Sequence, residues 1–225
     1  MTYFKCYYFE MSQILVKFVT KLTFDMSGHQ AIKNMISRLS QGAIFFPEDF
    51  SMIDSKDLIR TTLMRLTEEG YIGRLGFGIY YKSKIDEKWG TGTLYPSLDE
   101  IAKAIAKKDK ARIIPTGSAA LNMLGLSTQL QTNVVYYTDG SIRKIKIGDN
   151  KGIVFRRTTN MKNFAFKNEL MQLIVAALKE IGNNKVTDEE KKIIAERLKQ
   201  VPEEDFRVDL TLAPAWIQKL LKEIR

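Results

Sequence analysis

Apolar positions recur with a helical period in the first third of the chain. Over residues 28–40 they return every three or four positions, which predicts a first helix. Pro47 and the two acids after it are typical of a helix start, so residues 48–53 are predicted as a short second helix. Ser55 suits the N-cap of a third helix over residues 56–69, which a glycine ends.

The pattern then changes to short apolar runs. Residues 71–72 and 79–81 are such runs, and the segment 73–78 between them contains three glycines, which predicts a β-hairpin. Three helices followed by a hairpin is the order of elements in a winged helix-turn-helix. We predict this fold, and with it DNA binding, for residues 26–88.

The third predicted helix has a polar outer face that suits the major groove of B-DNA, which admits an α-helix. Arg60 and Thr61 are predicted to read base edges, and Lys56 and Arg65 to contact phosphates or the groove edge. Candidate contacts of the wing are Arg74, Lys82 and Lys84. For each of these residues the alternative is an ordinary solvated side chain. Arg65 has the further alternative of pairing with Glu68, with Glu69 or with an acid of the second predicted helix.

A second domain is predicted from residue 96 to the end of the chain, after a linker rich in Gly and Thr over residues 89–95. Its predicted helices cover residues 98–108, 117–124, 166–181, 188–199 and 214–224. Its predicted strands cover residues 133–138, 142–147 and 152–157, with glycine-containing turns between them. Strands joined by short turns usually pair with their neighbours, so we expect a three-stranded meander.

The predicted fold class is therefore α+β: a winged helix-turn-helix, then a mixed α/β domain with a small antiparallel sheet and C-terminal helices. Residues 1–25 are rich in Tyr and Phe and show no clear period. Two interpretations stay open for them: an upstream extension produced by an early start codon, or an added strand or helix.

Composition narrows the class of protein. The 225 residues are 44% hydrophobic and contain one cysteine, which excludes an internal disulfide and a cysteine-based zinc site. No run of apolar residues is as long as a membrane helix requires. We therefore expect a cytoplasmic protein that makes no contact with a membrane.

The net charge of +9 favours a polyanionic partner, and it is concentrated in the middle of the chain. Residues 91–168 contain 13 Lys and Arg residues against 5 Asp and Glu residues. Six of these cations form the predicted basic patch of the second domain: Arg112, Arg143, Lys144, Lys146, Arg156 and Arg157. Because five of them lie on predicted strands, where alternate residues share a face, a continuous patch is expected. It would extend the DNA-binding face or serve a separate partner.

Two stretches of sequence resemble a known family. The first is Ser55–Gly70, continuing into Arg74–Tyr81, and the second is Pro115–Gln129, followed by Tyr137-Thr138-Asp139-Gly140 and Arg143–Lys146. Together they are similar to the AbiEi-type antitoxins of type IV toxin-antitoxin systems. The resemblance implies a bacterial repressor that binds double-stranded DNA at inverted repeats in its own promoter. It also implies a second domain that counteracts a nucleotidyltransferase toxin without forming a stable complex with it.

The antitoxin-like motif has a functional and a structural interpretation. The functional interpretation places its polar residues around one surface together with Arg143: Ser118, Asn122, Gln129 and Thr138. The structural interpretation is that the small residues allow close helix packing, while Asn122 and Gln129 satisfy backbone groups. The sequence leaves both open.

An enzyme is the less favoured class. Gly117-Ser118 is similar to the opening of nucleotidyltransferases, but the paired aspartates that would bind catalytic metals are missing. His29 is the only histidine, and no P-loop or dinucleotide-binding glycine pattern is present. We therefore expect no catalytic site, no cofactor and no metal. The alternative to an antitoxin is a stand-alone winged-helix regulator whose C-terminal domain senses a ligand or partner.

Overall fold

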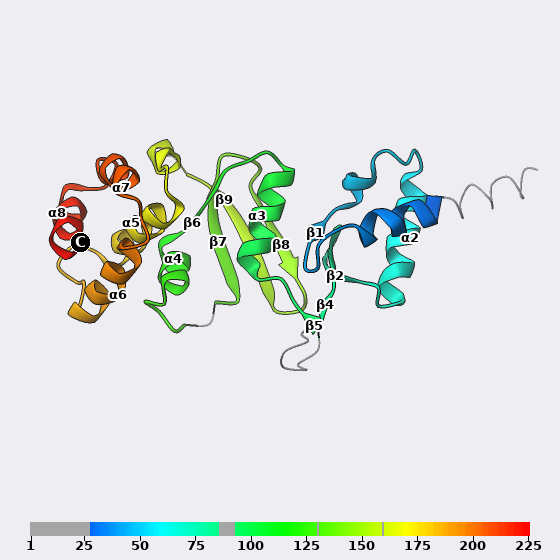
Figure 1. Ribbon diagram of the computed structural model, residues 1–225, viewed down its shortest axis with the longest axis horizontal. Helices are drawn as coiled ribbons and strands as arrows, with labels where there is room; N and C mark the ends of the chain where they lie inside the picture. Colours follow the sequence, from blue (N-terminus) through cyan, green and yellow to red (C-terminus); the bar gives the residue numbers. More distant parts are fainter. Residues whose placement is uncertain (1–27, 86–92, 130, 159) are drawn as a thin grey trace, which may run out of the picture. The chain divides into compact units, whose positions relative to one another are not determined.

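The chain divides into two compact units, Met1–Pro96 and Ser97–Arg225, each of which is described by itself. The computed structural model describes residues 28–85, 93–129, 131–158 and 160–225 (Figure 1). The predicted extension 1–25 and most of the predicted linker lie outside these residues. Helices and strands occur in both units, so the protein has a mixed α+β fold.

The first unit has a core between two helices and a small sheet. A helix over residues 28–37 and α2 (Lys56–Glu68) each bury one apolar stripe. The sheet contributes the buried side chains of β1 (Ile44–Phe45) and β3 (Ile79–Lys82). The core of this unit consists of Ile32, Ile36, Phe45, Phe50, Ile59, Leu63, Leu66, Ile72 and Tyr80.

Local signals set the ends of the helices in this unit. The Ser55 hydroxyl accepts the Leu58 N–H at 3.2 Å, and α2 begins at the predicted residue. The predicted second helix over 48–53 is wrong in type and length, because it is one 3-10 turn, η1 (Pro47–Phe50). The Asp49 carboxylate accepts the Phe46 N–H at 2.8 Å and closes this turn, and Phe50 then enters the core.

The predicted hairpin is confirmed as β2 (Ile72–Gly76) paired with β3, and β1 pairs with the other edge of β3. Gly73 lies opposite Tyr81 in the ladder, where a Cβ atom would come within 2.0 Å of the tyrosine ring. A side chain at this position would have to displace the Tyr81 ring. The strands β4 (Lys84–Ile85) and β5 (Thr93–Leu94) form a separate antiparallel pair.

The second unit has a four-stranded mixed sheet in the order β6-β7-β9-β8. The edge strand β6 (Ile113–Pro115) pairs antiparallel with β7 (Asn133–Thr138), and β7 pairs parallel with β9 (Lys151–Arg157). The other edge strand, β8 (Arg143–Ile147), pairs antiparallel with β9. The predicted antiparallel meander is therefore wrong, since β9 lies between its two predecessors.

The composition of the strands explains this order. The central strand β9 carries Gly152, Ile153 and Phe155, all buried, and so suits a position covered on both edges. By contrast, Lys144 and Lys146 of β8 are exposed, and charged side chains are typical of edge strands. The strand β6 was not predicted because it is short and ends in a proline.

One face of this sheet is covered by α3 (Leu98–Lys108), as Figure 1 shows. The predicted bounds of α3 are confirmed, and its N-terminus is a capping box of Ser97 and Glu100. The buried Tyr136 hydroxyl donates to the Asp99 carboxylate at 2.8 Å and joins the sheet to the helix. Burial, with Asp99 alongside, raises the pKa of Tyr136.

The C-terminal part of the chain forms a helical core. Its elements are α4 (Gly117–Leu124), η2 (Met161–Ala165), α5 (Glu169–Ile181), α6 (Asp188–Leu198), α7 (Glu203–Leu210) and α8 (Ala215–Ile224). The helix predicted from Phe166 begins later, because Phe166 is extended and Asn168 caps the Leu170 and Met171 N–H groups. Helix α7 was not predicted, and it buries the carboxylate of Asp209. Asp209 accepts the Lys167 and Asn168 N–H groups at 2.8 Å.

No described helix is both long enough and apolar enough to cross a membrane.

Candidate nucleic-acid interface

The outer face of α2 contains four of the predicted DNA contacts. Ile59, Leu63 and Leu66 are buried on the inner face of this helix. The exposed side carries three cations, two acids and two uncharged residues: Lys56, Asp57, Arg60, Thr61, Met64, Arg65 and Glu68. We call Lys56, Arg60 and Arg65 the α2 cations.

The α2 cations make no ion pair with any residue that the structure describes. Of the two glutamates proposed as partners of Arg65, Glu69 instead lies 4.0 Å from the ammonium of Lys33. That ammonium also lies 5.1 Å from the centre of the Tyr71 ring. Charges that have no protein partner are available to an external anion.

The tip of the β2–β3 hairpin adds an exposed arginine and an exposed aromatic ring. Arg74 is exposed, and its Nε donates to the Gly76 carbonyl at 3.3 Å. Phe77 is 91% exposed, next to Gly78, whose φ of +67° forms the turn. Phe77 was missed in the sequence, although a phenylalanine between two glycines at a predicted turn was a signal that it would be exposed.

The other two predicted wing residues differ from Arg74. The Lys82 ammonium donates to the carbonyl oxygens of Ser37 and Leu39, both at 2.7 Å, at the end of the helix over 28–37. Lysine bonded to the last carbonyls of a helix stabilises that end. Lys82 thus has a structural role in this unit, while Lys84 lies in β4 and its side chain is not described.

The register of the sheet divides the predicted basic patch of the second unit between two faces. Arg143 lies opposite Phe155 in the ladder and therefore shares with it the face that α3 covers. Arg157 lies two residues after Phe155 on β9, so its side chain is on this face too. Lys144 and Lys146 lie on the opposite face. Arg156 shares this second face because side chains alternate along a strand.

Two arginines of the predicted patch are paired with aspartates. Nε of Arg112 donates to the Asp139 carboxylate at 2.7 Å, and the backbone N–H of Arg112 donates to the same group at 2.7 Å. The hydrogen bond from the Arg112 side chain holds the pKa of Asp139 below its usual value. Arg143 forms an ion pair with Asp109. Both arginines are therefore charge-compensated and hold the turns at one end of the sheet.

Three cations of the patch lie on one face of the sheet and are exposed to solvent. Lys144, Lys146 and Arg156 are exposed, share one face, and have no ion-pair partner in the described part of the chain. We call them the sheet cations. Tyr137 lies on the same face and is half-buried. This smaller group replaces the six-residue patch expected from the sequence.

The polar residues of the antitoxin-like motif do not share a surface. Thr138 is 2% exposed, donates to the Arg112 carbonyl and accepts the Gly140 N–H, both at 3.0 Å. With its nitrogen facing the loop, the half-buried Asn122 amide donates to the Ser127 and Gln129 carbonyls at 2.8 and 3.0 Å. The exposed members are Ser118 and Gln129.

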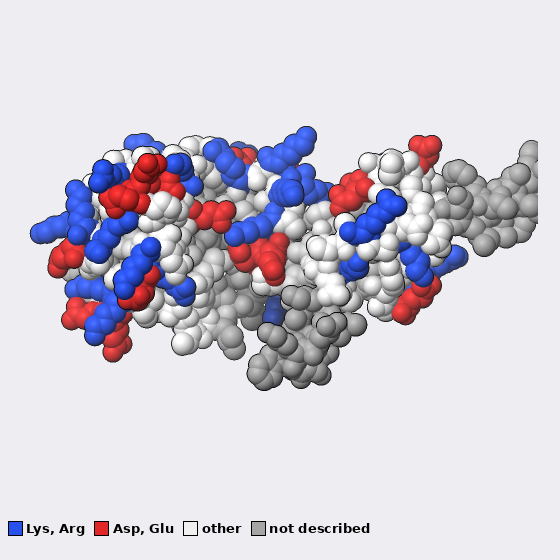
Figure 2. Space-filling view, in the orientation of Figure 1, with Lys and Arg blue, Asp and Glu red and all other residues white. Residues whose placement is uncertain are grey.

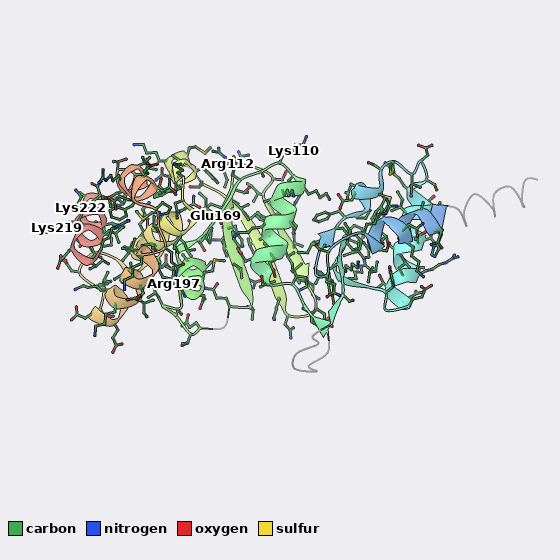
Figure 3. All side chains as sticks on the ribbon, in the orientation of Figure 1. Lys110, Arg112, Glu169, Arg197, Lys219 and Lys222 are labelled. Atoms are coloured by element: carbon green, nitrogen blue, oxygen red, sulfur yellow. The ribbon has the colours of Figure 1, made fainter. Side chains whose placement is uncertain are left out.

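Other charged groups of the second unit are mixed in sign. Figure 2 shows Lys and Arg side chains alternating with acids over the C-terminal helices. Lys110 and Arg112, labelled in Figure 3, lie where α3 passes into β6. Within the described ranges, no group of three or more His, Cys, Asp or Glu side chains is placed to hold a metal ion.

Comparison with known proteins gives a family but no activity. Residues 31–206 match a family of unknown function, DUF6088, and the chain belongs to this family. The crystal structure of the RV2827C protein from Mycobacterium tuberculosis is similar, with 12% identity and a TM-score of 0.41. That similarity covers 86% of this chain and 80% of the other. No curated protein matches significantly.

Proposed function

We propose that this protein is a DNA-binding transcriptional autorepressor and the antitoxin of a type IV toxin-antitoxin system. In this proposal the first unit is a winged helix-turn-helix, α2 is its recognition helix and the β2–β3 hairpin is its wing. The protein represses its own promoter and counteracts a nucleotidyltransferase toxin. It needs no catalytic site for either role.

The observation that supports DNA binding most directly is the α2 face. Its three cations are exposed and lack ion-pair partners among the described residues, whereas the nearby Lys33 is engaged by Glu69 and Tyr71. A helix with a buried inner stripe and free cations outside has the chemistry needed for base and phosphate contacts. Proposed contacts are Lys56, Arg60, Thr61, Arg65 and Arg74.

The antitoxin role rests on the sequence resemblance over residues 115–146. The described contacts assign Thr138 and Asn122 to holding turns, which leaves Ser118 and Gln129 as the exposed polar residues of that motif. The sheet cations supply a second open surface in the same unit. They would meet either operator phosphates or the partner of the antitoxin.

A mobility-shift titration tests DNA binding. The probe is the duplex immediately upstream of the gene, compared with an unrelated duplex of equal length. Arg60→Ala should cost roughly 1–3 kcal/mol of operator affinity and reduce the preference for the operator. Arg38→Ala, which removes an exposed cation of the same unit outside α2, is the control and should change neither quantity. Equal affinity and selectivity of Arg60→Ala and the unchanged protein would refute the proposed recognition helix.

Co-expression tests the antitoxin role separately. The toxin is the nucleotidyltransferase encoded beside this gene, and growth is the readout. Arg60→Ala should lose repression and keep rescue from the toxin, since rescue is assigned to the second unit. Absence of rescue by the unchanged protein would leave a stand-alone regulator as the function. A cavity in the second unit favours that alternative.

A further inference from the structure

The second unit contains a cavity that the proposed function does not use. It has a volume of about 340 Å³ and lies between β6, β7 and α5. Its apolar walls include Ile114, Tyr137, Phe166 and Val175. This size is in the lower range of small-molecule sites, and mostly apolar walls with a few polar groups are typical of them.

The polar groups of this cavity are mainly hydrogen-bond donors. The Lys179 ammonium donates to Oδ1 of Asn163 at 3.3 Å. The Gln172 amide nitrogen donates to the Asn163 backbone carbonyl at 2.7 Å. Among the described residues, Nδ2 of Asn163 and the hydroxyl of Tyr137 have no partner. The Lys179 ammonium, Nδ2 of Asn163 and the Tyr137 hydroxyl are thus three hydrogen-bond donors on residues that line this cavity.

The lysine has no counter-charge. Burial lowers the pKa of Lys179, and no nearby carboxylate raises it again. Glu180 also lines the cavity, but it makes no ion pair with Lys179, and its side chain packs against Gly117. Although Lys179 as a residue is exposed, its ammonium is partly desolvated and forms no ion pair with a described residue, so an anionic ligand would be stabilised there.

We propose that this cavity binds a small organic monocarboxylate. Its carboxylate would accept hydrogen bonds from Lys179 and Asn163, and its apolar body would lie against Tyr137 and Phe166. A phosphate is less suitable, because the cavity has one cation and no arginine among its lining residues. The ligand therefore carries one negative charge and an aromatic or aliphatic group.

Isothermal titration calorimetry of the full chain tests the proposal. The probes are phenylacetate, benzoate and hexanoate, with phenylacetamide as the neutral analogue and inorganic phosphate as the anion without an apolar body. At least one carboxylate should bind one to one, with a Kd on the order of 0.1–1 mM for a ligand of this size. Phenylacetamide and phosphate should bind at least about tenfold more weakly.

Two variants locate the site. Lys179→Gln should weaken carboxylate binding about tenfold or more, because it removes the charged donor. Lys222→Gln removes an exposed lysine of α8 and should change nothing. Ala176→Phe places a ring in the cavity and should abolish binding without altering the charge. Circular dichroism checks that each variant is folded.

The pH dependence gives an independent readout. Only the protonated lysine attracts the anion, and the pKa of Lys179 is lowered. Affinity should therefore fall as the pH rises through that lowered value, before ordinary lysines lose their charge. The proposal is overturned if no carboxylate binds, if the amide or phosphate binds equally well, or if Lys179→Gln binds as the unchanged protein does.

Discussion

The cations of α2 and those of the β8–β9 hairpin show how differently a helix and a sheet display a run of charges. On α2 the three cations fall on the side opposite a buried stripe, and all three remain free of described ion pairs. On the sheet, consecutive cations point to opposite faces, and one of them, Arg143, is paired with an aspartate. A helical face can therefore be identified from sequence, whereas a sheet surface requires the pairing to be known.

The difference matters for how each surface would bind an anion. The α2 cations need no rearrangement to meet a phosphate. In the second unit, Arg112 would first have to leave Asp139, and Arg143 would have to leave Asp109. Losing a charge-assisted hydrogen bond costs about 1.5–3 kcal/mol. The sheet cations, with the exposed Arg157 on the other face, should thus account for anion binding by this sheet.

The largest effect is expected from removing the sheet cations together, as Lys144→Gln, Lys146→Gln and Arg156→Gln in one variant. If they contact operator phosphates, the slope of log affinity against log salt should flatten by about 0.9 per residue. Base preference should stay the same, because phosphate contacts do not read sequence.

A matched control removes three cations that already have ion-pair partners. Lys191→Gln, Lys199→Gln and Arg207→Gln lower the net charge equally on the C-terminal helices and should leave the slope nearly unchanged. An equal slope change in both variants would show a general charge effect and not a surface. An unaltered slope with lost rescue from the toxin would assign the sheet cations to the antitoxin role.

Much of the fold could be predicted from local sequence signals. The bounds of α3, α4 and β7 follow from a capping box, a left-handed glycine at 125 and a β-branched run. The order of the strands could not be predicted, since it depends on which strand is buried on both edges. Helix α7 was missed because four of its eight residues are acidic, and its buried Asp209 is explained only by N–H groups some forty residues earlier.

The candidate sites also differ in how far they could be predicted from the sequence. The α2 face could be predicted because one element with one period defines it. The pairings of Arg112 with Asp139 and of Arg143 with Asp109 join residues 27 and 34 positions apart. No local pattern reveals such contacts. The cavity at Lys179 likewise combines residues of β6, β7, η2 and α5, which no local sequence pattern places together.

Asp139→Asn should destabilise the sheet end by about 1–1.5 kcal/mol, because it weakens two hydrogen bonds from the solvent-exposed Arg112. The folded-state pKa of Asp139 is lowered, so the ionised carboxylate stabilises the fold above its unfolded pKa and loses this effect as the pH falls. Urea unfolding of the unchanged protein and of the variant, at neutral pH and near pH 3, measures the loss of stability and its pH dependence. The difference in the free energy of unfolding between the two proteins should narrow at low pH. A constant difference would contradict the assigned ion pair.

Lys82→Met should cost about 1 kcal/mol of stability, since it removes two hydrogen bonds to carbonyls at a helix end and keeps the apolar stem. Urea unfolding gives this value. The salt slope of DNA binding should not change, because the ammonium is already bound within the unit. A decrease of nearly one unit in that slope would show instead that Lys82 meets a phosphate, as the sequence had indicated.

The smallest expected effect comes from Phe77→Ala at the hairpin tip. The side chain is 91% exposed, so its removal loses almost no packing and stability should stay within about 0.5 kcal/mol. If the wing enters the minor groove, an apolar ring there would contact or partly unstack bases, and operator affinity should fall a few-fold at an unchanged salt slope. Met52→Ala, which removes another exposed apolar side chain of the same unit, is the control and should leave affinity unaltered. Equal affinity for both variants would confine the DNA contacts of this unit to the α2 cations, Thr61 and Arg74.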